Sequence, residues 1–366
     1  MPTTLSDQTF APDYATPPGD TLADLLGDRE MTQTELARRL GVSLKHVNQI
    51  VNGAASISVE IALGLEKVFG VSADFWLNRT SLYLADLARR EERRDFEAAI
   101  GWANQFPIAE LRRQRFLPRD AKGADLVAAL LQFFGIAGLR QWSDPSASFR
   151  KSQKFESDPY AMSAWLRAGE IEAGTIKCEP YDTDRFLAAL EDIRSLTLLE
   201  PDIWYPRLVK LCAGAGVAVV IIDTFTGARA NGATRWLSPT KALIQLSLRY
   251  RWEDIFWFTF FHEAGHVILH RKKDVFVEPP KRLIDGRPEL VDWVRVENEA
   301  DRFASRTLIP SPYDHYIRRL AIGDIPNFAA KIGVAPAIVV GRLQYEGVIP
   351  YTHGNKLRRR FTFVRE

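Results

Sequence analysis

The segment His262-Glu263-Ala264-Gly265-His266 constrains this chain more than any other part of its sequence. Residues four apart lie on one face of an α-helix, so the imidazoles of His262 and His266 can reach a single cation. Glu263, between them, can hold a water molecule that the cation acidifies. An ordinary amphipathic helix can carry the same pattern, but the chain has only 6 histidines. The segment therefore predicts a hydrolytic zinc site of the metallopeptidase kind.

Length and composition set the outer limits. The 366 residues exceed one ordinary domain and suffice for two or three domains with proper cores. A formal net charge of +2 gives no global attraction to nucleic acid or acidic lipid, so any DNA contact requires a local patch. The two cysteines, Cys178 and Cys212, lack CxxC spacing. This favours two buried thiols in a reducing cytosol over a disulfide framework or a thiolate metal site.

Neither the N-terminal residues nor the most apolar run of the sequence predicts membrane association. Residues 1–20 lack the basic and apolar regions of a signal peptide, and we expect a flexible tail over residues 1–16. The most apolar run, Ile255 to Leu269, is interrupted by charged and imidazole side chains and is shorter than the roughly 20 residues needed to span a bilayer. We expect a buried helix there and a cytoplasmic protein.

Residues 32–53 carry a second, independent signal, a helix–turn–helix pattern. Thr32 and Glu35 form a capping box that begins a helix, Gly41 permits a tight turn, and Ser43 caps the next helix. Apolar residues fall where the two helices must face each other. These residues are Leu36, Ala37 and Leu40 in the first helix and Val42, Val47 and Ile50 in the second.

The exposed face of this pair is polar and suits double-stranded DNA. Its side chains can donate to phosphates or to base edges in a major groove. A helical hairpin with a solvated face is the alternative, but the caps, the glycine and the small alanine occur at mutually consistent spacing. Further helices are expected from Ser58 to Phe69 and from Ser72 to about Leu87. The predicted DNA-contacting residues are Gln33, Ser43, Lys45, His46, Asn48 and Gln49.

This stretch resembles the Cro/CI-type (XRE) helix-turn-helix, and within that superfamily the HigA antitoxin subgroup. The resemblance covers about residues 17 to 85 and rests on PPGDTLADLL, MTQTELARRLGVS, VNQIVNG and ISVEIALGLEKVFGVSADFWLN. It implies a homodimer that binds a palindromic operator, and a toxin partner that the protein neutralises.

The middle and the C-terminal part differ in pattern. Residues 88–200 are charged and helix-prone, and their arginines alternate with acidic residues as on a solvated helix face. After Pro201, β-branched runs predict strands at Val217–Ile222, Ala233–Leu237 and Ala242–Arg249, which lead into the helix bearing His262. Asn231–Trp236 is the candidate for a free sheet edge that holds an extended peptide.

The predicted fold class is multidomain, with all-α and α+β parts. We expect a tail over 1–16, an all-α helix-turn-helix domain over 17–87, a helical connector over 88–200, an α+β zincin-like metallopeptidase domain over 201–350, and a basic, solvated tail over 351–366.

A catalytic zinc usually has three protein ligands, so one more is required. Glu297 and Asp301 stand four apart on a predicted amphipathic helix, so Glu297 could bind the metal while Asp301 orients a histidine from behind. Glu299 lies about 200° around that helix from Glu297 and remains the alternative ligand. Two histidines and one glutamate can hold zinc or manganese. His270, eight residues after His262, is expected to be structural or to support a ligand.

The segments FWFTFFHEAGHVILH and ENEADRFASRTLIP resemble the ImmA/IrrE family of metallopeptidases, over about residues 200 to 350. The resemblance implies His262, His266 and Glu297 as zinc ligands and Glu263 as general base. Asp301 replaces the asparagine common at its position and preserves a hydrogen-bonding partner. Candidate oxyanion stabilisers are Tyr313, His315, Tyr316 and Arg235.

The sequence thus predicts a DNA-binding transcriptional regulator that carries its own zinc endopeptidase and cleaves a repressor, an antitoxin or another regulatory protein. The alternative is a HigA-like antitoxin and repressor whose zincin-like domain serves as a sensor or interaction scaffold. A general peptidase with an incidental helical hairpin is the third interpretation. Operator binding, toxin binding and peptide cleavage discriminate among the three.

Overall fold

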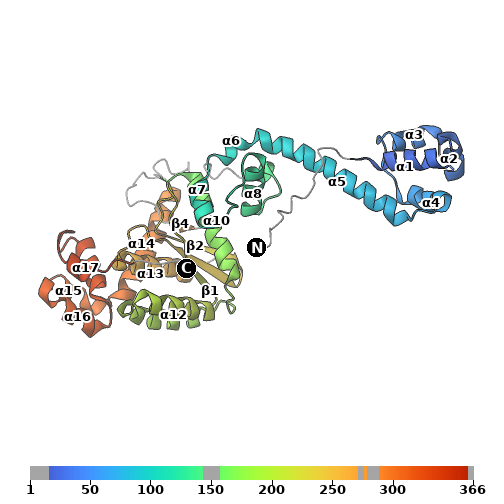
Figure 1. Ribbon diagram of the computed structural model, residues 1–366. Coiled ribbons are helices and arrows are strands. Elements are labelled where there is room, and N and C mark those ends of the chain that lie inside the picture. Colours follow the sequence, from blue (N-terminus) through green and yellow to red (C-terminus); the bar gives the residue numbers. More distant parts are fainter. Residues whose placement is uncertain (1–15, 143–156, 271–275, 278–287, 362–366) are drawn as a thin grey trace, which may run out of the picture. The chain divides into compact units, whose positions relative to one another are not determined.

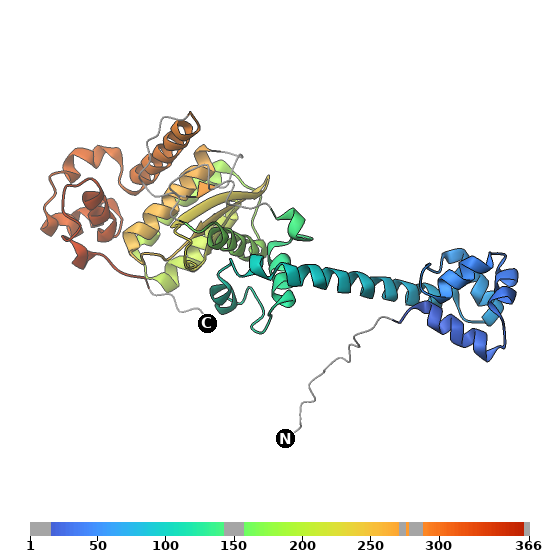
Figure 2. The same cartoon turned by 90° about the horizontal axis from the view of Figure 1, so that it is seen from above.

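The computed structural model describes residues 16–142, 157–270, 276–277 and 288–361. The chain divides into two units: the first contains residues 1–101 and 122–127, and the second contains residues 102–121 and 128–366. Figures 1 and 2 show the helices and strands of both units. Within the described ranges, no helix combines the length and apolar character needed to cross a membrane. Both cysteines are free thiols; Cys212 is buried as expected, whereas Cys178 is only half-buried.

The N-terminal unit is helical, and its helices begin where the sequence predicts. The hydroxyls of Thr32, Ser43, Ser58 and Ser72 each accept a hydrogen bond from the backbone N–H three residues later, which caps a helix start. Gly41 ends the second helix with a φ of 70°, a left-handed conformation that favours glycine. The elements are α1 (Pro18–Asp28), α2 (Gln33–Leu40), α3 (Leu44–Val51), α4 (Val59–Phe69) and α5 (Ala73–Ala98).

The core of this unit joins α2 and α3 through the predicted apolar residues. Leu36, Ala37, Val47 and Ile50 are buried together, in one cluster with Trp76 of α5. The helix–turn–helix prediction is therefore confirmed at the level of local structure and packing.

The boundary expected near Leu87 is wrong, because α5 continues to Ala98. Residues 88–98 contain no glycine or proline and are rich in arginine, glutamate and alanine, which favour helix. Three further helices follow: α6 (Ile100–Ala103), α7 (Ile108–Arg113) and α8 (Ala124–Phe134).

Residues 157–200 do not form a separate connector. They supply α10 (Pro159–Thr175) and α11 (Thr183–Ser195), and Phe186 and Ile193 of α11 are fully buried in the same core as the sheet. The expectation of a helical connector up to residue 200 fails because the apolar face of α11 covers that core. The remaining major elements are α12 (Pro201–Gly214), β1 (Val217–Ile221), β2 (Gly232–Ser238), β3 (Lys241–Leu246), α13 (Glu253–Leu269), β4 (Phe276–Val277), α14 (Pro288–Leu308), α15 (Asp314–Ile317), α16 (Ile325–Ile332) and α17 (Pro336–Tyr345). Short 3-10 turns occupy Leu139–Gln141, Leu196–Leu198, Ser311–Tyr313, Ile322–Asp324 and Asn355–Leu357.

The described strands form one mixed sheet in the order β1-β3-β2-β4. β1 pairs with β3 in parallel and β2 pairs with β3 antiparallel, with Thr234 opposite Ile244. The three strands predicted from sequence are present, although β3 ends at Leu246. The predicted free edge at Asn231–Trp236 is corrected, since Ala233 and Thr234 of β2 pair with β4.

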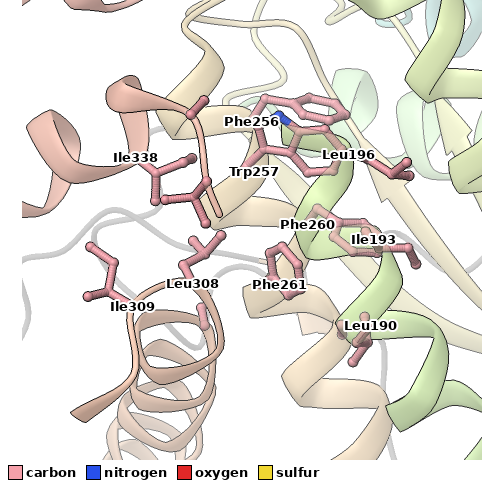
Figure 3. Close-up of a cluster of buried hydrophobic side chains, with 14 of the residues drawn as sticks. Leu190, Ile193, Leu196, Phe256, Trp257, Phe260, Phe261, Leu308, Ile309 and Ile338 are labelled. Atoms are coloured by element: carbon pink, nitrogen blue, oxygen red, sulfur yellow. The ribbon is translucent and has the colours of Figure 1, made fainter. Parts of the chain in front are cut away.

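Helix α13 passes through the core of the C-terminal unit. Figure 3 shows the aromatic side chains of Phe256, Trp257, Phe260 and Phe261 among aliphatic residues from α11, α14 and α17. Next to them, α14 approaches α13 closely at Gly265, where an added Cβ would lie 3.2 Å from the Cα of Ala300. A larger residue at Gly265 would therefore separate the two helices that carry the predicted site.

The buried start of α13 is held by the C-terminal segment. Arg358 donates to both carboxylate oxygens of Asp254 at 2.8 and 2.9 Å, and both side chains are buried. Arg359 pairs with Glu253, and Phe361 is 2% exposed in the core. The expected solvated tail is thus wrong at Arg358, Arg359 and Phe361, because the two arginines neutralise buried acids and Phe361 is buried, whereas residues 351–353 are exposed; residues 362–366 lie outside the described range.

Replacing Arg358 by alanine should destabilise the protein by about 3–5 kcal/mol, because Asp254 would remain buried without its charged partner. Urea denaturation followed by tryptophan fluorescence measures the change. Arg319→Ala, at an exposed position, is the matched control and should leave stability within about 0.5 kcal/mol. Equal stability of the two variants would contradict this account of the C-terminal segment.

Candidate functional site

Two neighbouring helices bring His262, His266 and Glu297 together. The Nε2 atoms of the two histidines lie 3.0 Å apart. Glu297 of α14 places Oε2 3.2 Å from His262 Nε2 and Oε1 3.3 Å from His266 Nε2. Both histidine side chains are almost fully buried. Among the described residues, these three form a His/Cys/Asp/Glu group whose ligand atoms all lie within 4.8 Å of one another.

Each histidine is oriented from behind by a second contact. His262 Nδ1 lies 2.8 Å from a carboxylate oxygen of Asp301, so its Nε2 faces the cluster. His266 Nδ1 lies 3.1 Å from Nδ1 of His270, whose Nε2 lies 3.0 Å from Glu299. With Glu299 ionised and both imidazoles neutral, one proton order fits these contacts: His270 donates to Glu299, and His266 donates to His270. That order leaves Nε2 of His266 free of a proton.

Glu299, the alternative metal ligand, therefore contacts His270 and does not belong to the group formed by His262, His266 and Glu297. Its carboxylate contacts His270 and Arg295 on the outer side of the cluster. Sequence reasoning expected His270 to be structural or supporting and did not foresee that it links Glu299 to His266. The eight-residue spacing of His262 and His270 was the available signal, since it places the three imidazoles along one side of α13.

The ionisation of the cluster reflects burial opposed by local charge. Burial alone would lower the pKa of His262, but hydrogen bonds with Asp301 and Glu297 raise it well above its usual value. Burial lowers the pKa of His266. For Glu297 the burial effect is outweighed by the two imidazoles, which lower its pKa to about 2. An ionised carboxylate thus faces two imidazoles, a donor set that attracts a cation.

These residues fit a zinc ion. Zinc bonds of about 2.0–2.2 Å in tetrahedral geometry place neighbouring ligand atoms roughly 3.3 Å apart. In the cluster the two Nε2 atoms lie 3.0 Å apart, and each lies 3.2 or 3.3 Å from a different carboxylate oxygen of Glu297. Oε1 of Glu297 is buried and accepts no hydrogen bond within the described residues. A cation on these atoms would give this buried oxygen a positively charged partner in addition to the imidazole of His266.

Glu263 is held by a contact that the sequence did not reveal. The hydroxyl of Thr234 on β2 donates to Glu263 Oε2 at 2.6 Å, and both side chains are buried. The only sequence signal for this contact was the alternation of side chains along a strand, which places the Thr234 hydroxyl on one of the two faces of the sheet. Thr234 therefore fixes the carboxylate of the predicted general base.

Of the candidate oxyanion stabilisers, Arg235 lies on β2, whereas the other three lie together at residues 313–316. Arg235 follows Thr234 on β2, so it faces the other side of the strand, where it pairs with Glu170 of α10. The rings of Tyr313 and Tyr316 pack against Phe328 of α16. His315 is exposed. These contacts give none of the four a demonstrated role beside Glu263.

In the N-terminal unit, the predicted DNA-contacting residues lie at the start of α2 and on α3. Lys45 and Asn48 are exposed, whereas His46 and Gln49 are half-buried. The amide of Asn48 donates to Gln33 at 3.3 Å, so one hydrogen bond joins the polar faces of the two helices. Ser43 caps α3 through its hydroxyl oxygen. The structure thus brings Gln33 and Asn48 together and gives Ser43 a structural task as well.

Comparison with known families identifies this unit. Residues 22–76 match the family described as Helix-turn-helix. No match is found among curated proteins. The chain therefore contains an N-terminal helix-turn-helix domain of the XRE type, and the match ends well before the HExxH segment.

Solved structures similar to the chain align with about a quarter of it. An addiction module antidote protein of the HigA family from Coxiella burnetii is 35% identical over 23% of this chain and 92% of its own, with a TM-score of 0.22. The Pseudomonas aeruginosa antitoxin HigA, solved with the higBA promoter, is 32% identical over 22% and 90%, with the same TM-score. Another Pseudomonas aeruginosa protein, solved in complex with its operator DNA, is 34% identical over 23% and 94%, again with 0.22.

Replacing Thr234 by valine should lower stability by about 1–3 kcal/mol, because the variant removes the donor to a buried carboxylate. Thermal denaturation of metal-free protein measures the loss, and Thr234→Ser, which keeps the hydroxyl, is the control. A valine variant as stable as the wild type would show that this hydrogen bond does not hold Glu263.

Proposed function

We propose that this chain, with its XRE-type helix-turn-helix domain, is a DNA-binding transcriptional regulator that carries a zinc-dependent endopeptidase. Its substrate would be a repressor, an antitoxin or another regulatory protein. The observation that carries the proposal is the buried convergence of His262, His266 and Glu297, with Glu263 fixed beside them by Thr234. This arrangement is also that expected from the resemblance to the ImmA/IrrE metallopeptidases.

The three ligands would hold zinc, which when bound supplies a Lewis acid that polarises a carbonyl and acidifies water. Asp301 and His270 keep the two imidazoles turned toward the ligand cluster. Glu263 accepts the proton of the attacking water and returns it to the leaving amide nitrogen. Thr234 limits the movement of that carboxylate, so the proton acceptor stays beside the reacting atoms.

The N-terminal domain would bring this chemistry to an operator. Two of the similar proteins were solved with promoter or operator DNA, which supports a double-stranded DNA partner for this domain. Val59 and Leu63, four apart on α4, are about half exposed, which supports a homodimer through that face. A regulator that cleaves another regulator at its operator would switch transcription irreversibly.

A second function is a HigA-like antitoxin and repressor with a toxin partner, in which the C-terminal unit is a metal-bound scaffold. The observation in its favour is that this chain covers 92% of the HigA-family antidote protein from Coxiella burnetii and 90% of the Pseudomonas aeruginosa antitoxin HigA. Incubation with zinc or manganese and the proteins encoded next to this gene separates the two functions. Cleavage by the wild type and its loss in Glu263→Gln support the peptidase, and intact substrates in both samples support the scaffold.

Metal content should depend on Glu297 and hardly on Glu299. We expect the wild type to retain one zinc ion after dialysis and Glu297→Ala to lose it, because only two ligands remain. Glu299→Gln is the matched control and should keep its zinc. Asp301→Ala should weaken zinc affinity by about 10- to 100-fold, since it frees the His262 ring. Inductively coupled plasma spectrometry and competition with a chelating dye measure these changes. Retention of zinc by Glu297→Ala would move the ligand assignment to Glu299.

Binding to the duplex upstream of this gene should require α3. Lys45→Ala should weaken binding to all sequences alike and reduce the salt slope by about 1, as expected for a phosphate contact. Gln49→Ala should cost about 1–3 kcal/mol on the preferred sequence by loss of a base contact. Lys67→Ala, at an exposed position of α4, is the control. Fluorescence anisotropy at several salt concentrations measures the effects, and unchanged binding of both α3 variants would exclude this face.

A further inference from the structure

A cavity of about 620 Å³ lies in the C-terminal unit, and neither the metal cluster nor the DNA-binding domain uses it. Its volume is within the range of about 300–1,000 Å³ that is common for ligand pockets. Residues from α13, α14, α17 and the C-terminal segment form its walls.

The cavity lies next to the metal cluster, because residues of the same two helices, α13 and α14, line the cavity and form the cluster. On α13, Phe258 and Thr259 line the cavity and stand four residues before His262 and Glu263, hence on the same face. On α14, Ser305 lines the cavity and stands four residues after Asp301. α13 thus places the cavity one turn, about 6 Å, from His262, and on α14 the cavity lies one turn from Asp301 and two turns, about 12 Å, from Glu297.

An extended polypeptide advances about 3.3 Å per residue. A peptide whose scissile bond lies at Glu263 therefore carries a side chain into the cavity within about two residues of that bond. The Phe258 ring, which lies 6.4 Å from the His262 ring and 6.4 Å from the Tyr345 ring, spans this short distance.

The walls favour an apolar occupant. Ile255, Phe258, Leu308 and Ile338 contribute aliphatic and aromatic surface. The charged groups on the wall are already paired, since Arg358 binds Asp254 and also donates to the buried Gln344. A charged occupant would lose its hydration without gaining an ionic partner, which is costly.

Aromatic side chains suited to protein contact also line the cavity. Tyr250, Tyr345 and Tyr351 are 47, 53 and 68% exposed, although they belong to the same cavity lining. Tyrosine combines a large apolar ring with a hydroxyl that can remain hydrated, which suits the border between a pocket and solvent.

We infer that this cavity receives a bulky apolar side chain of the polypeptide substrate, within about two residues of the scissile bond. This inference rests on the proposed peptidase function and makes the enzyme selective for leucine- or phenylalanine-like residues near the cleaved bond.

The test measures binding, so that it does not depend on turnover. Fluorescein-labelled capped hexapeptides that differ only at one central residue, Leu, Phe, Asp or Lys, are titrated into full-length Glu263→Gln protein. We expect Leu and Phe peptides to bind about 10-fold or more tightly than Asp and Lys peptides. Ser305→Phe should abolish this preference by filling the cavity, and Leu187→Phe, on exposed α11 surface, should preserve it.

Tyr345→Ala provides a second variant at an exposed position, in case Ser305→Phe does not fold. It should weaken binding of the Leu and Phe peptides. Equal binding of all four peptides, or full selectivity in a folded Ser305→Phe protein and in Tyr345→Ala, would overturn the inference. Binding of free apolar amino acid amides with no gain from the peptide would also overturn it, in favour of a small-molecule effector.

The two proposals can fail separately. If the zinc-loaded wild type leaves its bound peptides intact, the peptidase function fails and the pocket stands. If it cleaves all peptides at equal rates, the peptidase stands and the inferred pocket fails.

Discussion

Helix α13 imposes the constraint on which the C-terminal unit depends: a helix buried on nearly every side carries five ionisable side chains. Glu253 and Asp254 at its start and His262, Glu263 and His266 further along are all buried. Burial of such groups is costly unless each has a partner. The surrounding elements supply those partners, because Arg358 and Arg359 reach the first pair and Glu297, Asp301 and Thr234 reach the others.

The same constraint connects stability with chemistry. Glu297 lies within hydrogen-bonding distance of the two imidazoles, and Asp301, His270 and Thr234 restrict the movement of His262, His266 and Glu263. In the proposed enzyme, such restriction would hold the ligands and the proton acceptor in place before a substrate arrives. The aromatic and aliphatic side chains of α13 shield these residues from bulk water, and toward the start of the helix they give way to the apolar cavity.

The features of the fold that the sequence predicted correctly are those set by interactions between residues close together in the chain. The helix-turn-helix could be predicted from sequence, because its caps at Thr32 and Ser43 and its left-handed Gly41 depend only on residues three or four positions away. The role of α11 and the pairing of β2 with β4 depend on distant partners, and there our expectations were wrong. The sequence showed that the C-terminal segment is rich in arginine. It did not show that Arg358 and Arg359 pair with Asp254 and Glu253, about a hundred residues earlier.

By itself the sequence determined two local patterns: the helix-turn-helix, and the spacing that puts His262, Glu263 and His266 on one turn of helix. It also narrowed the third ligand to Glu297 or Glu299, two residues on one helix. Only the tertiary structure placed Glu297 rather than Glu299 against the histidines, paired Thr234 with Glu263 and set the cavity beside them. The reason is physical: spacing fixes the face of a helix, but which face meets which neighbour follows from packing between segments far apart in the chain.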